Sequence, residues 1–243
     1  MSKKIIPVTF SNMDLFNQCP LKWYYTVLKK MRSKGNVFAL FGKAMHNLLE
    51  LVYKLEIFEP QPYLDRWKRI FDTEYQSKSY PEFTQNILKW QLYRGYPMIK
   101  KFFETAAKYD VLKSALGTEK KISGKFGNYL VVGRYDLEHI LKKKNTLVDY
   151  KSGKTKSESH KHQLTLYTEI ENTKRKTNKI EQCALWYLPT GEVEIFKPTR
   201  KATALFLRDT LAEQANCLKT KTFERRKNRF CKYCIVKEKG LCK

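Results

Sequence analysis

The chain has 243 residues, 42% hydrophobic and 14% aromatic, which is enough to bury a substantial core. Its 48 Lys and Arg residues against 24 Asp and Glu residues give a net charge of +24. This excess makes nucleic acid the leading partner, with an anionic membrane surface or simple codon bias as alternatives. Because the sequence has neither a membrane-spanning apolar run nor a signal-peptide core, we expect a cytoplasmic protein that does not contact membranes.

The first half of the chain is predicted to be helical. Residues 9–30 predict a short helix capped at Ser11, a break at Pro20, and a second helical stretch. Apolar residues at helical spacing predict an amphipathic helix over 37–58. Residues 61–110 have few β-branched residues and continue the helical pattern.

The second half of the chain begins with a composition that favours strands over helices. Residues 120–153 are rich in Val, Ile, Leu and Tyr with Gly and Asn breaks, and they predict three or four strands. A helix over 159–173 follows, and 180–198 predict a hairpin that turns at Pro-Thr-Gly. An amphipathic helix over 200–218 precedes a basic, Cys-rich tail at 219–243. The mixture predicts an α/β fold.

Asp149 and Lys151 end one predicted strand. Residues two apart on a strand point to one face, so the carboxylate and the ammonium should project side by side. Such a pair suits phosphodiester hydrolysis, because a carboxylate holds Mg²⁺ or Mn²⁺ and an ammonium orients the attacking water. Alone the triplet is unspecific, since Glu119–Lys121 matches it as well.

Other residues extend this candidate site. Asp136 ends the preceding apolar strand, and two carboxylates on adjacent strands could share one cation. His46 lies on the amphipathic helix, where a histidine is usually structural, yet imidazole suits Mn²⁺ beside carboxylates. Gln163 and Tyr167 are four residues apart on a helix and share one face.

The segments GKAMH, GRYD, DYK and QLTLY, in this order, resemble the RecB-type branch of the PD-(D/E)XK nuclease superfamily. The resemblance extends from about residue 9 to the end. It implies a restriction-endonuclease-like core, with a central mixed β-sheet flanked by helices, a helical insert and a C-terminal cluster-binding tail. Gly133 matches the glycine that precedes the family's metal-binding acid, which favours Asp136 over Glu138 on the same expected strand face.

The resemblance also implies roles for individual residues. The implied metal ligands are His46, Asp136, Asp149 and the backbone carbonyl of Tyr150. The implied catalytic residues are Asp136, Asp149, Lys151, Gln163 and Tyr167. Glu119 is an additional acidic candidate. We expect one nuclease domain over 1–243, divided into an N-terminal segment 1–36, a helical region 37–110, a nuclease core 111–218 and a Cys-rich tail 219–243.

The six cysteines provide a separate indication of a metal site. Cys231, Cys234 and Cys242 form a C-x2-C-x7-C tail that needs a fourth ligand, for zinc or for an iron–sulfur cluster. Cys183 and Cys217 lie in apolar segments and are predicted to be core residues, which leaves Cys19. A zinc knuckle is one interpretation. The resemblance instead implies a structural [4Fe–4S] cluster that ties the two ends of the chain together.

The function implied is a Mg²⁺- or Mn²⁺-dependent DNA exonuclease in recombination, repair or phage DNA processing. A CRISPR-adaptation nuclease that trims DNA before integration, or a catalytically inactive nucleic-acid-binding module, are the alternatives. Expected partners are DNA, either single-stranded or an end-containing duplex, and a helicase or a recombination or integration protein, because the chain has no P-loop motif. The aromatic residues that could stack on bases, or pack around the first cysteine, are Trp23, Tyr24, Tyr25 and Phe230.

Overall fold

The computed structural model describes residues 8–31, 37–75, 82–112, 115–126, 129–228, 231 and 234–242, and side chains within the segment 82–84 are excluded. The N-terminal elements are β1 (Val8–Thr9), α1 (Phe10–Gln18), α2 (Pro20–Trp23) and the π-helical turn η1 (Tyr24–Leu28). The predicted break is confirmed, because Cys19 is extended at φ −168° and α2 starts at Pro20. The predicted cap is wrong, since the Thr9 hydroxyl, not Ser11, accepts the Asn12 N–H.

The predicted helical region is confirmed as α3 (Val37–Leu55), α4 (Gln61–Tyr75) and α5 (Glu82–Lys108). The helices pack through large aromatic side chains. Trp67 of α4 is fully buried and donates its indole N–H to the Leu92 carbonyl of α5 at 2.8 Å. Gly95 permits this approach, because a Cβ atom there would lie 2.3 Å from the Trp67 ring.

A central mixed sheet follows, as the sequence predicts. The strands are β2 (Ala115–Phe126), β3 (Tyr129–Leu141), β4 (Lys144–Lys151), β5 (Gln182–Tyr187) and β6 (Glu192–Phe196). Neighbouring strands pair antiparallel, except that β4 pairs parallel with β5 and β1 pairs parallel with β3. Helix α6 (Glu158–Lys174) makes the crossover between β4 and β5 that a parallel pair requires.

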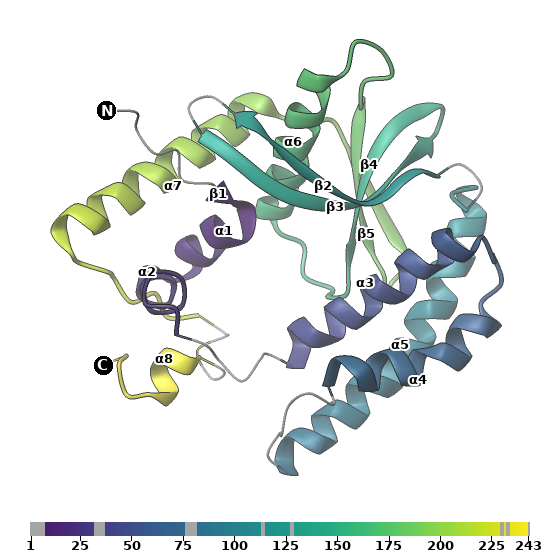
Figure 1. Cartoon of the computed structure of the whole chain (residues 1–243), viewed down its shortest axis with the longest axis horizontal. Coiled ribbons are helices and arrows are strands. Elements are labelled where there is room, and N and C mark those ends of the chain that lie inside the picture. Colours follow the sequence, from purple (N-terminus) through teal and green to yellow (C-terminus); the bar gives the residue numbers. More distant parts are fainter. Residues whose placement is uncertain are drawn as a thin grey trace.

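Helices cover both faces of the sheet. Figure 1 shows α3, α4 and α5 gathered on one side, with α1, α2 and α7 (Arg200–Thr220) on the other. Alternation along β4 follows this arrangement, because Val148 and Tyr150 join the core beneath α3 to α5, whereas Leu147 joins the core beneath α1, α6 and α7. Successive residues at the end of β4 therefore point to opposite faces of the sheet. One face meets side chains of α3 to α5, and the other meets side chains of α1, α6 and α7.

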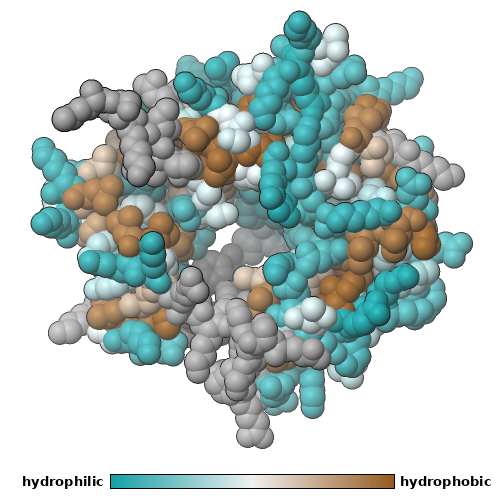
Figure 2. All heavy atoms as spheres, viewed as in Figure 1, coloured by the Kyte–Doolittle hydropathy of each residue, from teal (hydrophilic) through white to brown (hydrophobic). Residues whose placement is uncertain are grey.

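Two elements were not predicted. The sequence gives no signal for β1, which has only two residues, or for α8 (Ile235–Glu238) in the tail. Hydrophilic side chains dominate the face seen in Figure 2, with apolar patches between them. In the part of the chain that is described, no helix has the length and apolar character needed to cross a membrane.

Candidate active site

Strands β2 and β3 are irregular at opposed positions. Glu119 and Asp136 are not paired with each other, but the residues on either side of them are paired in one register. Glu119 therefore lies opposite Asp136. Glu119 has φ 47°, in the left-handed region that side chains other than glycine seldom adopt. Along β3, Tyr135 packs on the α6 side, whereas Leu137 packs on the α3 side, so the normal alternation is broken at Asp136. Such local strain clusters at functional sites.

The break separates Asp136 from Glu138. We expected these two side chains to share a face, and that expectation is wrong. Glu138 points to the α6 side, where it accepts a hydrogen bond from Tyr135 Oη at 3.0 Å and another from Arg175 at 2.7 Å. Glu138 is thus committed to a buried ion pair, and Asp136 is the carboxylate left for the site.

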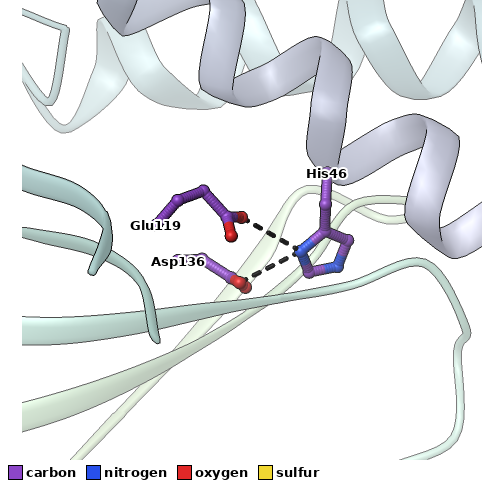
Figure 3. Close-up of side chains that lie close together, drawn as sticks. All are labelled: His46, Glu119 and Asp136. Atoms are coloured by element: carbon purple, nitrogen blue, oxygen red, sulfur yellow. Dashed lines mark hydrogen bonds and ion pairs between the residues drawn. The ribbon is translucent and has the colours of Figure 1, made fainter. Parts of the chain in front are cut away.

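Helix α3 brings His46 to the two acidic side chains. His46 Nδ1 lies 3.0 Å from Asp136 Oδ1 and 3.8 Å from Glu119 Oε1, and Figure 3 shows all three side chains converging. One ligand atom from each residue lies within 4.8 Å of the others, which is the spacing of a metal site. Arg134 extends the group, because its guanidinium lies 3.2 Å from the other oxygen of Glu119.

The charges of this group depend on one another. Burial lowers the pKa of His46, but the Asp136 and Glu119 carboxylates outweigh this effect and hold that pKa well above its usual range. Burial raises the pKa of Asp136; the charge of His46 opposes this rise and that of Asp149 adds to it. Without a metal ion, the imidazolium of His46 therefore offsets the negative charge of the site.

Asp149 and Lys151 meet as the sequence predicts. Lys151 Nζ lies 2.6 Å from Asp149 Oδ2, an ion pair that lacks the alignment of a hydrogen bond. Asp149 is near enough for its charge to act on His46 and Asp136, but it is outside the closest ligand group of the described residues. The Tyr150 N–H donates to Asp136 Oδ2 at 2.6 Å, which joins the end of β4 to the same site.

Helix α6 supplies the remaining predicted residues. Lys151 Nζ donates to Gln163 Oε1 at 3.4 Å, and Gln163 Nε2 donates to Tyr167 Oη at 3.5 Å. Tyr167 is buried against β3, where a Cβ atom on Gly133 would lie 2.5 Å from its ring. The glycine of the GRYD segment therefore makes room for a tyrosine that lies beside the site.

We predict that Gly133→Ala displaces Tyr167 and destabilises the protein by about 1–3 kcal/mol, because the added methyl group overfills this contact. Urea unfolding measures the loss. The matched control is Gly117→Ala on β2, where a Cβ atom would have nothing within 4 Å. Equal stability of the two variants would contradict the close contact.

The four cysteines of the predicted cluster line one cavity: Cys19, between α1 and α2, faces it together with Cys231, Cys234 and Cys242 of the tail. In the described part of the chain, no three of their sulfurs lie within 4.8 Å of one another. The cavity has a volume of about 70 Å³. Hydrogen bonds hold the tail in place: Asn228 donates to the Gln18 carbonyl at 3.0 Å, and the Asn228 N–H donates to Cys231 Sγ at 3.3 Å.

The other two cysteines lie in the core, as predicted. Cys183 is fully buried and contacts Thr168 at 3.2 Å, and Cys217 packs in a small cluster with Phe16 and Trp23. The same cluster takes up the N-terminal aromatic residues: Trp23 is 6% exposed, and Tyr24 stacks on Phe223 at 4.2 Å. Tyr25 packs edge-on against Tyr24, and the predicted Phe230 lies outside the described residues.

A model of the PD-(D/E)XK nuclease superfamily matches residues 7–242. The chain belongs to this superfamily. In a comparison of sequences, no curated protein matches this nuclease-superfamily chain. Membership agrees with the mixed sheet flanked by helices, and it implies a nucleic acid substrate.

A solved structure gives the same fold. A candidate exonuclease from Eubacterium rectale matches with a TM-score of 0.56 and 13% identity, over 96% of this chain and 87% of that one. At this identity the match supports the fold alone. A structure designated SSO0001 matches over 98% of this chain and 87% of its own, with 15% identity and a TM-score of 0.42.

Two residues of the site are more prominent than the sequence indicated. Glu119, only an additional acidic candidate in the sequence, is one of the three closest ligand groups. Arg134 was not singled out, although it lies in the GRYD segment two residues before Asp136, where strand periodicity would place it near the same edge.

Proposed function

We propose that this chain is a metal-dependent DNA exonuclease that hydrolyses phosphodiester bonds. The observation that supports the proposal is the convergence of His46, Glu119 and Asp136 from separate elements, with the Asp149–Lys151 pair alongside. Glu119, Asp136 and Asp149 bring three carboxylates near one imidazole. Carboxylate oxygens with one imidazole suit Mg²⁺ or Mn²⁺, and the donor set therefore fits a divalent ion.

The residues then have distinct roles. His46, Asp136 and Asp149 would hold the ion with the Tyr150 carbonyl, and Glu119 joins them in our proposal. When bound, such an ion supplies Lewis-acid activation of the phosphate and of a water molecule. Lys151 orients that water and offsets charge on the phosphate, because its ammonium lies beside Asp149 at the end of β4.

Gln163 and Tyr167 act as positioning residues for Lys151. Gln163 accepts a hydrogen bond from the ammonium and donates to Tyr167, and Tyr167 is fixed against Gly133. This arrangement limits the rotation of a long side chain that would otherwise sample many rotamers. We further propose that residues 1–243 form one nuclease domain with its catalytic core over 111–218.

We propose a structural [4Fe–4S] cluster at the four cysteines that line the common cavity. Four thiolates on one zinc ion lie about 2.3 Å from the metal and so within about 4 Å of one another, whereas no three cysteine sulfurs among the described residues lie within 4.8 Å of one another. Basic side chains also line the cavity, including Lys22, Arg226 and Lys237, and their charge would offset that of a cluster bound by four thiolates. The four thiols and the spacing of their sulfurs both fit a cluster.

The same hydrolysis would serve recombination, repair, phage DNA processing or CRISPR adaptation, so the proposal concerns the reaction and not one pathway. The net charge of +24 supports DNA as the substrate through contacts with phosphate. Any unwinding would be supplied by a helicase partner.

A time course on end-labelled single- and double-stranded DNA, with Mg²⁺ or Mn²⁺ and with EDTA, tests the activity. When the label is at the attacked end, we expect labelled mononucleotides or short products from the first time points, because an exonuclease releases them from that end. When the label is at the other end, the labelled strand should shorten progressively. A circular single strand is the control and should remain intact. Cleavage of the circle would show an endonuclease, and no cleavage of any substrate would refute the proposed function.

A further inference from the structure

Helix α5 carries two large aromatic side chains on the surface of the protein. Trp90 and Tyr93 lie three residues apart, so they share one side of the helix, and they are 55% and 70% exposed. Exposed tryptophan is unusual because its burial is strongly favourable, and the other three tryptophans of the chain are at most 6% exposed. This pair takes no part in the site described above.

Arg94 connects the aromatic pair to that site. Its guanidinium lies 5.0 Å from the Trp90 ring and 4.4 Å from the Phe41 ring, which places the cation between two aromatic side chains. The same guanidinium donates a hydrogen bond to the Ser152 carbonyl at 2.6 Å. Ser152 directly follows Lys151 in the chain.

Helix α3 completes the connection from the other side. A Cβ atom on Gly42 would lie 3.3 Å from Ser152 Oγ, so the backbone of α3 passes close to the end of β4. His46 follows Gly42 by one helical turn and therefore lies on the same side of α3. In Figure 1, α3 and α5 lie together on the same side of the sheet.

We propose that Trp90 and Tyr93 form a stacking surface for the bases of single-stranded DNA next to the proposed cleavage site. Base–aromatic stacking tolerates any sequence, and the basic charge of the chain would hold the backbone of the strand. Arg94 contacts both the Trp90 ring and the Ser152 carbonyl, and it therefore fixes the position of Trp90 relative to Lys151. The inference depends on the proposed function in naming DNA as the ligand, and it deepens that function by naming the unpaired strand as the form bound beside the site.

Tryptophan fluorescence provides a direct test because Trp23, Trp67 and Trp186 are buried and only Trp90 is accessible to a ligand. The full-length protein is titrated with an oligothymidylate of about 15 nucleotides, within the length that single-strand sites commonly cover, in buffer without divalent metal. We expect quenching that saturates. Heparin, a polyanion without bases, should leave the fluorescence unchanged, and equal quenching by heparin would overturn the proposal.

Variants separate stacking from charge. Trp90→Ala should weaken binding of the labelled oligonucleotide roughly 5- to 150-fold, measured by anisotropy, whereas Trp90→Phe should retain affinity but lose the quenching. The matched control is Tyr129→Ala, which removes another exposed aromatic residue on the distant start of β3 and should bind as the wild type does. Unchanged melting temperatures show that the variants fold. Equal affinity of Trp90→Ala and wild type would overturn the proposal, and would indicate a protein contact at this surface instead.

The binding assay also distinguishes this inference from the proposed function. Quenching and loss of affinity without any metal-dependent cleavage would support the stacking surface and refute the nuclease activity. Cleavage with no effect of Trp90→Ala on binding would do the reverse.

Discussion

Asp149→Asn should lower the rate of metal-dependent DNA cleavage by ~10³-fold or more, which corresponds to about 4 kcal/mol of transition-state stabilisation. The amide keeps the shape of the carboxylate but removes the charge that pairs with Lys151 at 2.6 Å and that would hold a cation. Two opposing effects act on the stability of this variant. Removing the charge relieves its repulsion with Asp136, whose pKa it helps to raise, but it also leaves the largely buried ammonium of Lys151 without its partner. The rate is therefore compared at equal amounts of folded protein.

Single-turnover cleavage of end-labelled DNA measures the effect, with urea unfolding alongside. The matched control is Asp209→Asn on α7, where the side chain is 66% exposed and pairs with its neighbour Arg208. This control should cleave at the wild-type rate. Persistent cleavage by Asp149→Asn would remove the carboxylate from the mechanism.

Cys19→Ser should abolish incorporation of iron and destabilise the protein by about 4–5 kcal/mol, because a cluster held at Cys19 and in the tail closes nearly the whole chain into one loop. For a chain of this length the loss corresponds to a decrease in melting temperature of roughly 10–20 °C. Anaerobically purified wild-type protein should be brown and contain about four iron atoms per chain.

The control for this variant is Cys217→Ala. Cys217 is buried at the end of α7 but does not line the cavity, so its replacement should leave the iron content unchanged. Colourless wild-type protein with one zinc per chain would refute the cluster and support a zinc knuckle. Iron retained in Cys19→Ser would exclude this cysteine as a ligand.

Periodicity and motif order predicted much of the structure from sequence. Strand alternation correctly placed Lys151 beside Asp149, and helical spacing correctly joined Gln163 to Tyr167, because both are local geometric relations. Cys19 was selected because it was the only upstream thiol outside an apolar segment, and it lines the same cavity as the three tail cysteines, although their role as ligands stays a prediction. The helices of the insert were also predicted, since their apolar spacing extends over many turns.

The rest depends on features that periodicity does not encode. The left-handed backbone of Glu119 turns its carboxylate toward His46, and nothing in the local sequence indicates this conformation. The break in alternation at Asp136 likewise places the side chain of Glu138 on the opposite face of the sheet. Strict alternation would have kept Asp136 and Glu138 on one face. Tertiary contacts with α3 and α6 decide both positions, so a rule based on neighbouring residues could not find them.

The imidazolium of His46 has a consequence for how the protein responds to its surroundings. Because a proton on this ring already counterbalances the neighbouring acids, the pocket is assembled before any cation arrives. A cation that binds at this ring must displace that proton, so the affinity of the site for Mg²⁺ or Mn²⁺ should rise with pH. Because such an ion binds the folded chain and not the unfolded one, added Mg²⁺ or Mn²⁺ should also raise the melting temperature.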